Sequence, residues 1–387
     1  MDGMAAVRVL RIIARMNVGG PAVEISGLMR HLDSDRFDQR LLTGWCDPHE
    51  EDYLTTQAPD IQATRITGLG RAVRPTDDAT AFWQLVKQIR EFRPHILHTH
   101  TAKAGALGRA AAEFAGARPI RVHTYHGHVL NGYFSGAKTK AIVQVEKSLA
   151  WRTDALITVG AQVRDELLAA GIGKPAQYSV IPPGLEPLRF PTRSEARAIL
   201  GLDPNAPVVC VVGRVTQIKS PDRVADVARI LGRRFPGLTI LVAGAGDLAG
   251  ELADRVATEQ LPITMLGWRD DVETIFAASD LALLTSDNEG TPLSLIQAAL
   301  AGIPSVATDV GAVHEVVLDA VTGLLTPCDP ERIANAVASL LENPERRVTM
   351  GEAGRVRAEE LYTVQRFADA HGALYESLIA AKARTGR

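Results

Sequence analysis

Cysteine, long apolar runs and an excess of charge of one sign are all scarce in this sequence of 387 residues. Only Cys46, Cys210 and Cys328 occur, far apart in the chain, which suits a reducing cytoplasm better than a disulfide framework. The formal net charge of −3 gives no reason to expect general nucleic-acid binding. With 46% hydrophobic and 22% charged residues, the composition is that of a soluble globular protein.

No apolar run reaches the roughly 18 residues that a membrane-spanning helix needs. The N-terminal segment MDGMAAVRVLRIIARMNVGG is not expected to be a secretory signal, because arginines interrupt its apolar stretch. Any membrane contact should therefore be peripheral, at the inner face of the cell membrane, unless the basic side chains are simply solvated. The basic residues that would favour such a contact are Arg71, Arg74, Lys138 and Lys140.

Strand-like and helix-like segments alternate along nearly the whole chain, as in VRVLRIIA followed by PAVEISGLMRHL. This βαβ rhythm is typical of a parallel doubly wound sheet. It stops at VIPPGLEP, where prolines cannot continue regular pairing, and restarts at APVVCVVGRV. Because the chain is also too long for one ordinary core, we predict two α/β domains, residues 1–182 and 183–364. A C-terminal helix at about 365–387 is expected to pack back on the first domain.

The segment SDNEGTPLSLIQAALAG places an acidic residue, Glu289, in a tight turn between a buried strand and a helix. Pro292 is expected at the first helical position, and Gly302 at the helix end. The carboxyl ends of strands in open α/β sheets bind ligands, and the free N–H groups of a helix start favour anions. A carboxylate there would repel phosphate, so we expect Glu289 to grip another part of the same ligand.

Other strand-to-helix turns carry glycines or cations. Gly19 and Gly20 follow the first strand, where a backbone without side chains can approach a diphosphate closely. Arg214 ends a later strand and Lys219 begins the next helix, so both could clamp phosphate at one sheet edge, or could be solvated charges. In VAGAGDLAG, Gly246 completes a Gly-x-Gly that lacks the third glycine of a dinucleotide fingerprint, so a tight turn lining a cleft explains it as well.

Histidines cluster in the segments HILHTH and IRVHTYHGH. A metal site is not expected, because no aspartate or cysteine stands at a supporting spacing. His126, at a predicted strand end, could hydrogen-bond a ligand hydroxyl or stabilise developing charge, and His128 could point the same way. The other histidines are expected to be scaffold residues. Lys103 and Gly105, at the turn after HILHTH, suit a phosphate of a second substrate and simple helix initiation equally well.

Taken together, these segments resemble the retaining nucleotide-sugar glycosyltransferases of family 4, over nearly the whole chain. The matching segments follow in the family order and are HTHTAKAGALGR, HTYHGHVLNGYF, VIPPGLE, GRVTQIKS and SDNEGTPLSLIQAALAGIPSVATDVGAVHEVV, of which the last is the most specific. The first two are similar to a bacterial subgroup of polysaccharide and glycolipid assembly. The resemblance implies the GT-B architecture, in which two Rossmann-like domains with parallel sheets, the acceptor side first and the donor side second, face each other across a cleft.

The resemblance also implies roles for matching residues. Arg214 and Lys219 would hold the donor diphosphate, and the Gly19–Gly20 loop would face it. Glu289 would contact hydroxyls of the donor sugar, and His126 would lie near that sugar and the reaction centre. The turn whose backbone would meet sugar and phosphate is Gly290, Thr291, Pro292 and Leu293, and the loop beside the nucleobase carries Trp268 and Arg269.

One position departs from the family pattern. Family members carry a second glutamate eight residues after the first, commonly on ribose hydroxyls, and this chain has Gln297 there. A glutamine amide oxygen accepts a hydrogen bond but brings no charge. A charge-assisted bond contributes about 1.5–3 kcal/mol against about 1 kcal/mol for a neutral one, so we expect weaker ribose anchoring.

The implied reaction moves a sugar, with retention of its configuration, from a nucleoside diphosphate to an acceptor hydroxyl. UDP is the expected nucleotide and GDP the next choice, and the acceptor is a glycan, a lipid-linked glycan or a small molecule. No metal or other cofactor is expected to be required, because the two cations and a helix N-terminus would stabilise the leaving group. The alternatives are a nucleotide-sugar epimerase, a nicotinamide oxidoreductase and a non-catalytic nucleotide-sugar-binding protein, the last favoured somewhat by Gln297.

Overall fold

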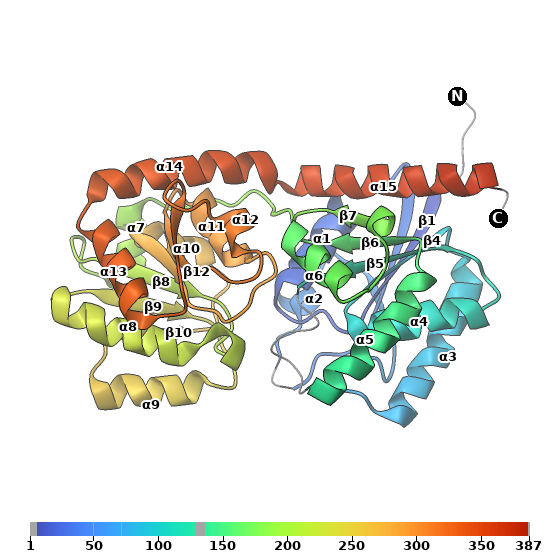
Figure 1. The fold of residues 1–387 in the computed structure, drawn as a ribbon, viewed down its shortest axis with the longest axis horizontal. Helices are drawn as coiled ribbons and strands as arrows, with labels where there is room; N and C mark the ends of the chain where they lie inside the picture. Colours follow the sequence, from blue (N-terminus) through green and yellow to red (C-terminus); the bar gives the residue numbers. More distant parts are fainter. Residues whose placement is uncertain (1–5, 49, 71, 128–135, 386–387) are drawn as a thin grey trace. The chain divides into compact units, whose positions relative to one another are not determined.

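The computed structural model describes residues 6–48, 50–70, 72–127 and 136–385, so Arg71 and His128 lie outside the described residues. The chain forms two compact units, Met1–Glu186 with Thr363–Arg387, and Pro187–Tyr362 (Figure 1). The first crossing follows Glu186 rather than the predicted residue 182, because the segment beyond the prolines is still tied to the first unit. The N–H of Val364 donates to the carbonyl of Leu185 at 3.0 Å, and the Glu186 carboxylate pairs with His31 Nε2 at 2.8 Å.

The first unit is built on a parallel sheet of seven strands in the order β3-β2-β1-β4-β5-β6-β7. Its centre, β1 with β4 and β5, consists of buried residues apart from positions near the strand starts. All of these strands point the same way, so their carboxyl ends form one edge. The strands are β1 (Val7–Ile13), β2 (Phe37–Thr43), β3 (Ala63–Arg65), β4 (Ile96–His100), β5 (Ile120–Tyr125), β6 (Ala155–Thr158) and β7 (Tyr178–Val180).

Helices cover this sheet and bury its apolar side chains. The C-terminal helix α15 places Phe367, Ala368 and Tyr375 in the same core cluster as Val9 and Leu28. Because α15 also packs beside α1, the tail of the chain completes the first unit rather than the second. The helices are α1 (Gly20–His31), α2 (Tyr53–Thr56), α3 (Pro75–Phe92), α4 (Ala102–Phe114), α5 (Gly136–Trp151), α6 (Ala161–Ala169) and α15 (Val364–Thr385), with a short 3₁₀ turn, η1 (Pro175–Gln177).

The second unit has a parallel sheet of six strands in the order β10-β9-β8-β11-β12-β13. The chain moves outward from β8 to β10 and then returns to β11 beside β8, so the strand order reverses between β8 and β11. Such a reversal opens a crevice at the carboxyl ends of the two strands. The strands are β8 (Val208–Val212), β9 (Thr239–Ala243), β10 (Ile263–Gly267), β11 (Leu281–Leu284), β12 (Ser305–Thr308) and β13 (Gly323–Thr326).

Proline and a side-chain acceptor mark several helix starts in this unit. Asp329 accepts from the N–H of Arg332 at 2.8 Å and Asn343 from that of Arg346 at 3.0 Å, each just before a proline in the first turn. The helices are α7 (Arg193–Ile199), α8 (Pro221–Arg234), α9 (Ala249–Glu259), α10 (Val272–Ala278), α11 (Leu293–Leu300), α12 (Val313–Val316), α13 (Pro330–Leu341) and α14 (Pro344–Leu361), with a 3₁₀ turn, η2 (Gln217–Lys219).

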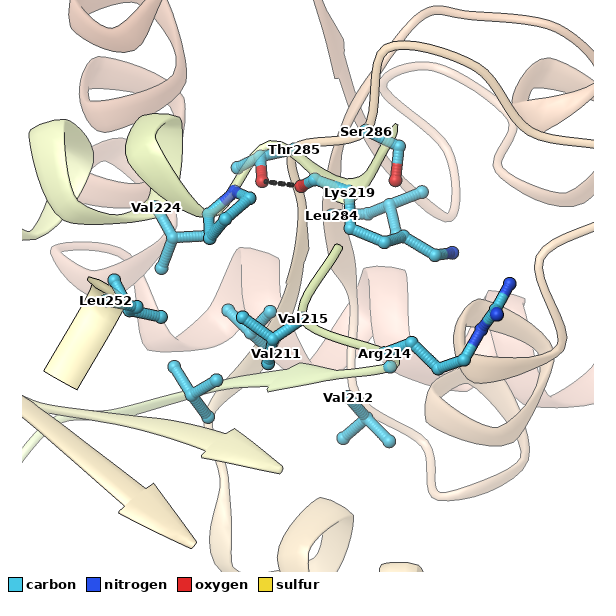
Figure 2. A pocket seen from close by; sticks show the side chains of 13 residues that line it. Val211, Val212, Arg214, Val215, Lys219, Val224, Leu252, Leu284, Thr285 and Ser286 are labelled. Atoms are coloured by element: carbon cyan, nitrogen blue, oxygen red, sulfur yellow. Dashed lines mark hydrogen bonds between the residues drawn. The ribbon is translucent and has the colours of Figure 1, made fainter. Parts of the chain in front are cut away.

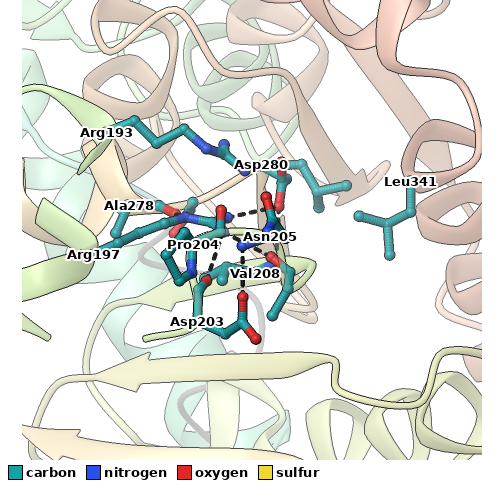
Figure 3. A network of polar contacts seen from close by, with 12 residues as sticks. Arg193, Arg197, Asp203, Pro204, Asn205, Val208, Ala278, Asp280 and Leu341 are labelled. Carbon is teal, nitrogen blue, oxygen red and sulfur yellow. Dashed lines mark hydrogen bonds and ion pairs between the residues drawn. The ribbon is translucent and has the colours of Figure 1, made fainter. Parts of the chain in front are cut away.

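A buried charge network holds the amino end of this second sheet (Figure 3). The Asp280 carboxylate, just before β11, accepts from Arg193 at 2.8 Å, Arg197 at 3.2 Å and the N–H of Val208 at 2.8 Å. Arg197 also donates to the carbonyls of Asp203, Pro204, Ala206 and Ala278. The network therefore joins α7, the loop before β8 and the start of β11, on the opposite edge from the strand-order crevice.

None of the helices in the described part of the chain combines the length and apolarity that a bilayer-crossing segment needs.

Candidate functional site

Glu289 lies in the turn between β11 and α11, where its carboxylate is held from two sides. Lys219 Nζ forms an ion pair with Glu289 Oε1, and the buried Ser286 Oγ donates to the same oxygen at 2.5 Å. The Glu289 side chain is only 10% exposed and that of Lys219 25%. The acidic residue and one of the two predicted cations therefore form one charge cluster beside the strand-order crevice.

Two loops are fastened together to build this cluster, one after β8 and one after β11. Thr285 Oγ1 donates to the carbonyl of Lys219 at 3.0 Å (Figure 2), and the N–H of Asp287 donates to the carbonyl of Ile218 at 2.9 Å. Arg223 binds the carbonyl of Thr285 and pairs with Asp287 at 2.7 Å. These contacts fix the backbone on both sides of Lys219, so its side chain starts from a rigid base.

Arg214 extends from the end of β8 toward the same side as the Lys219 ammonium (Figure 2). The residue is exposed, and within the described part of the chain its side chain has no hydrogen-bond or ion-pair partner. An unpaired guanidinium next to a neutralised lysine leaves net positive charge at the crevice, which favours an anion. The pocket in this figure is lined by Val211, Val215, Val224 and Leu252 together with Arg214 and Lys219.

The Gly-x-Gly after β9 lets the neighbouring loops touch. A Cβ on Gly244 would lie 1.9 Å from the carbonyl oxygen of Gly213, and one on Gly246 would lie 2.1 Å from that of Val215. The N–H of Val215 donates to the carbonyl of Ala245 at 3.0 Å across this contact. Gly246 is therefore explained by close packing of the loop that carries Arg214.

The turn residues predicted to meet the ligand lie where α11 begins. Pro292, expected as the first helical residue, is instead the N-cap, with an extended ψ of 104°, and the helix starts at Leu293. Gly290 and Thr291 precede it in the turn. The N–H groups of Leu293 and Ser294 have no partner among the described residues, so they are available to an anion or a hydroxyl.

The other predicted donor-site residues lie on α11 and in the loop after β10. Arg269, after β10, donates to both oxygens of Asp271 at 2.7 and 2.6 Å, and this pairing raises the pKa of Arg269 and lowers that of Asp271. Trp268 beside it is half-buried. Gln297 is half-buried on α11, and its amide has no hydrogen-bond partner in the described parts of the structure.

In the first unit, the glycine loop and His126 meet through a residue that the sequence analysis did not single out. Gly19 is the N-cap of α1 and Gly20 its first residue. From the next turn of α1, the Glu24 carboxylate accepts from His126 Nδ1 at 3.1 Å. His126 Nε2 lies 3.0 Å from Nδ1 of His100, so both ring nitrogens are occupied within the unit.

The remaining histidines of the cluster are buried parts of the sheet. His98 Nδ1 accepts from Arg11 at 3.0 Å and contacts the hydroxyl of Tyr375 at 2.6 Å, and its Nε2 contacts Thr124 Oγ1 at 2.7 Å. Burial lowers the pKa of His98, His100 and His123 well below the usual histidine value, so all three are neutral. No group of three or more metal-binding side chains occurs among the described residues.

Lys103 holds a loop in place. Its ammonium donates to the carbonyl of Ala72 at 2.6 Å and pairs with Asp78 at 2.5 Å, and its side chain is only 11% exposed. A Cβ on Gly105 would lie 2.5 Å from the ring of His123, so this glycine allows α4 to pack on β5. These contacts explain both residues without a bound phosphate.

Sequence reasoning missed three residues that orient others, Ser286, Glu24 and Asp271, and expected His100 only as a scaffold residue. Only Ser286 and Asp271 carried a local signal, because each lies two or three residues from its partner. Glu24 is separated from His126 by 102 positions, and no local pattern reports such a contact.

Two family profiles match this chain in succession. The profile described as "Glycosyl transferase 4-like domain" matches residues 19–184, and that described as "Glycosyl transferases group 1" matches residues 192–357. The first profile begins after β1 and ends within the first unit, and the second profile lies within the second unit.

Curated relatives extend over both units. The chain is 29% identical over 326 residues to the Escherichia coli UDP-Gal:alpha-D-GlcNAc-diphosphoundecaprenol alpha-1,3-galactosyltransferase. The aligned region covers 81% of this chain and 82% of that protein. It is 30% identical over 310 residues to the D-inositol 3-phosphate glycosyltransferase of Saccharomonospora viridis, covering 74% of this chain and 70% of that protein.

Solved structures share the fold. Sucrose-phosphate synthase from Thermosynechococcus elongatus superposes with a TM-score of 0.82 at 24% identity, covering 97% of this chain and all of that one. Anabaena HepE in complex with UDP-glucose superposes with a TM-score of 0.80 at 22% identity, covering 97% of this chain and 99% of that one.

Proposed function

We propose that this chain, which belongs to the family 4 glycosyltransferases of GT-B architecture, moves a hexosyl group from a UDP-sugar to an acceptor hydroxyl with retention of configuration. Family membership establishes a glycosyltransferase that uses nucleotide sugars. The identity of the nucleotide, the stereochemical course and the acceptor are the proposal.

One observation carries the donor site: the Lys219–Glu289 pair with unpaired Arg214 at the strand-order crevice. A diphosphate needs cations and N–H donors, and Arg214, Lys219 and the start of α11 supply both. A donor sugar needs a hydrogen-bond acceptor beside the phosphates, and Glu289, which pairs with Lys219, would supply it. Because Ser286 also holds Glu289, the carboxylate stays in place when Lys219 turns to the diphosphate.

These groups would act on the leaving diphosphate. As the bond from the anomeric carbon to the β-phosphate oxygen breaks, negative charge grows on the diphosphate, where Arg214 and Lys219 stabilise it. The acceptor oxygen bonds to the anomeric carbon on the same face, and its proton passes to the departing phosphate. The balance is one glycosidic bond formed, one glycosyl–phosphate bond broken and one proton transferred.

The names of similar proteins support UDP and a phosphorylated acceptor. The Escherichia coli relative is named for UDP-Gal, and Anabaena HepE is solved with UDP-glucose. The acceptors in the two relatives' names, a diphosphoundecaprenol-linked GlcNAc and an inositol 3-phosphate, both carry phosphate. For this chain we favour a sugar or cyclitol hydroxyl near a phosphate or diphosphate group. A lipid-linked acceptor would add a peripheral membrane contact, for which the exposed Arg74 and Lys140 are available.

A thermal-shift panel tests the donor. UDP-glucose, UDP-galactose, UDP-N-acetylglucosamine, GDP-mannose and nicotinamide dinucleotide are each added to the full-length protein, and the preferred donor raises Tm by mass action. We expect a UDP-sugar to give the largest shift. A shift with the GDP-sugar alone would replace UDP in the proposal, and none with any nucleotide sugar would overturn the donor site.

Glu289→Ala tests the site itself. We expect transfer of the sugar to fall by about 100-fold or more, while UDP still stabilises the protein because freed Lys219 can bind phosphate. Glu359→Ala is the control, since Glu359 is an exposed carboxylate on α14 of the same unit and lies outside the two loops that hold Lys219. Equal donor consumption by wild type and Glu289→Ala would refute the enzymatic role of this turn.

A further inference from the structure

Glu24, His126 and His100 form a chain of hydrogen bonds at the carboxyl edge of the first sheet. Glu24 Oε2 lies 3.1 Å from His126 Nδ1, and His126 Nε2 lies 3.0 Å from His100 Nδ1. The side chains of Glu24 and His126 are 6% and 9% exposed, and His100 is 1% exposed. All three groups are therefore nearly removed from water.

The hydrogen bonds among Glu24, His126 and His100 run in one direction. A carboxylate oxygen accepts hydrogen bonds, so His126 Nδ1 is the donor in its contact with Glu24. Burial lowers the pKa of His100, so His100 is neutral and has one proton. With that proton on Nδ1, His100 donates to His126 Nε2, and only the lone pair of its Nε2 is left without a partner. Every donor of the chain then points toward the carboxylate.

This chain of hydrogen bonds joins α1, β4 and the segment after β5. Glu24 lies on α1, which begins at the Gly19–Gly20 loop. His100 ends β4, and His126 follows β5, its neighbour in the sheet. The Glu24–His126 contact therefore ties the glycine-loop helix to the segment after β5 across 102 residues.

We propose that Glu24 is a positioning residue, which fixes the ring orientation and the Nδ1–H tautomer of His126 for the transfer reaction. The proposal rests on the proposed function, in which His126 serves that reaction. Because both ring nitrogens are occupied, His126 acts through the fixed position of its ring and backbone and does not take a proton from the acceptor. The direct hydrogen bond from its imidazole to a ligand hydroxyl, expected from the sequence, stays a separate prediction.

The energetic cost of the arrangement argues against a purely stabilising role. A nearly buried carboxylate that makes one hydrogen bond in the described part of the chain has lost more hydration than that bond restores. The unpartnered His100 Nε2 adds a further cost. Apolar residues of similar volume would fill the same space without these desolvation costs. The presence of the polar groups therefore points to their role in holding His126.

Three variants test the proposal in the full-length protein. Glu24→Ala removes the acceptor, Glu24→Gln keeps an acceptor without charge, and Glu186→Gln changes the partly exposed glutamate that pairs with His31 as a matched control. We expect Glu24→Ala to lower kcat by about 10-fold to 100-fold with a much smaller change in donor KM, and Glu24→Gln to recover part of the loss. Glu186→Gln should match wild type.

Nitrogen-15 NMR of histidine-labelled protein reads the tautomer without any substrate. Wild type should show His126, identified by its loss in His126→Gln, as an Nδ1–H tautomer, and Glu24→Ala should shift this signal while Glu186→Gln leaves it unchanged. An unchanged His126 signal in Glu24→Ala, or wild-type kcat, would overturn the proposal. A changed signal in a protein that turns over no donor would instead keep the positioning role and reject the proposed function.

Discussion

The two units share a parallel sheet with helices on it, but they place charge in different parts of that sheet. The strands of the first unit carry arginines and histidines, among them the fully buried Arg11 and His98 at its centre. The strands of the second unit, β8 to β13, carry no charged residue and no histidine. The charged residues next to this sheet lie just before a strand, as Asp280 does, or after one, as Arg214 and Glu289 do.

This difference separates two ways of building a polar site. In the second unit, an aliphatic sheet supports charges that remain at its edges, where Arg214 keeps enough exposure to meet an anion. In the first unit, polar side chains inside the sheet hydrogen-bond to one another, and only the groups at the strand ends lie at the carboxyl edge. All of the ten histidines except His314 belong to the first unit. We therefore expect a fall in pH to lower the stability of the first unit more than that of the second.

Acidification should produce the largest difference between the units. Burial lowers the pKa of His98, His100 and His123 well below 6.5 and that of His371 to about 3. The unfolded chain therefore binds more protons than the native one below pH 6.5, and stability falls as the pH falls. Each histidine contributes up to about 1.4 kcal/mol per pH unit in that window.

Urea unfolding at pH 7 and pH 5.5, followed by pulsed hydrogen–deuterium exchange and mass spectrometry, measures this effect in the full-length protein. Peptides from residues 187–362 report the unfolding of the second unit, and the other peptides report that of the first. An unchanged midpoint for the first unit, or an equal loss in the second, would contradict the contrast drawn between the sheets.

Removing the buried carboxylate of Asp280 should have the opposite effect to acidification: it should lower the stability of the second unit and leave that of the first unchanged. Asp280→Ala leaves Arg197 buried beside a missing counter-charge, and losing one partner of a buried pair costs about 3–5 kcal/mol. Calorimetry should show one transition moving to lower temperature. The control is Glu342→Gln, which breaks the exposed Arg234–Glu342 pair and should change little. A matching shift in both variants would show that the Asp280 network is no more important than a surface pair.

The smallest expected effect sharpens the description of the second unit's edge. Gln297→Glu restores a charged acceptor on α11, and we expect UDP to bind more tightly by about 1 kcal/mol, roughly fivefold. Titration calorimetry with UDP on wild type and variant measures the change. Equal affinities would place the ribose away from this position.

Local patterns predicted the elements that carry the site. The βαβ rhythm gave the order of strands and helices, and prolines marked the segment near which the chain crosses between units. The turn at Glu289 was predicted because a buried strand, a glycine and a proline follow one another within a few residues. The helix start differed by one residue, since Pro292 takes an extended backbone and serves as the cap.

The sequence by itself determined where strands end and helices begin, because apolar periodicity and turn residues act over a few neighbours. It could not determine which ends meet. Lys219 neutralises Glu289 because β11 returns to pair with β8, and His126 is held by Glu24 because β5 lies two strands from β1, whose helix carries that carboxylate. Arg11 meets Tyr375 across 364 positions for the same reason. Partners so distant are chosen by strand order and helix packing, which only the folded chain possesses.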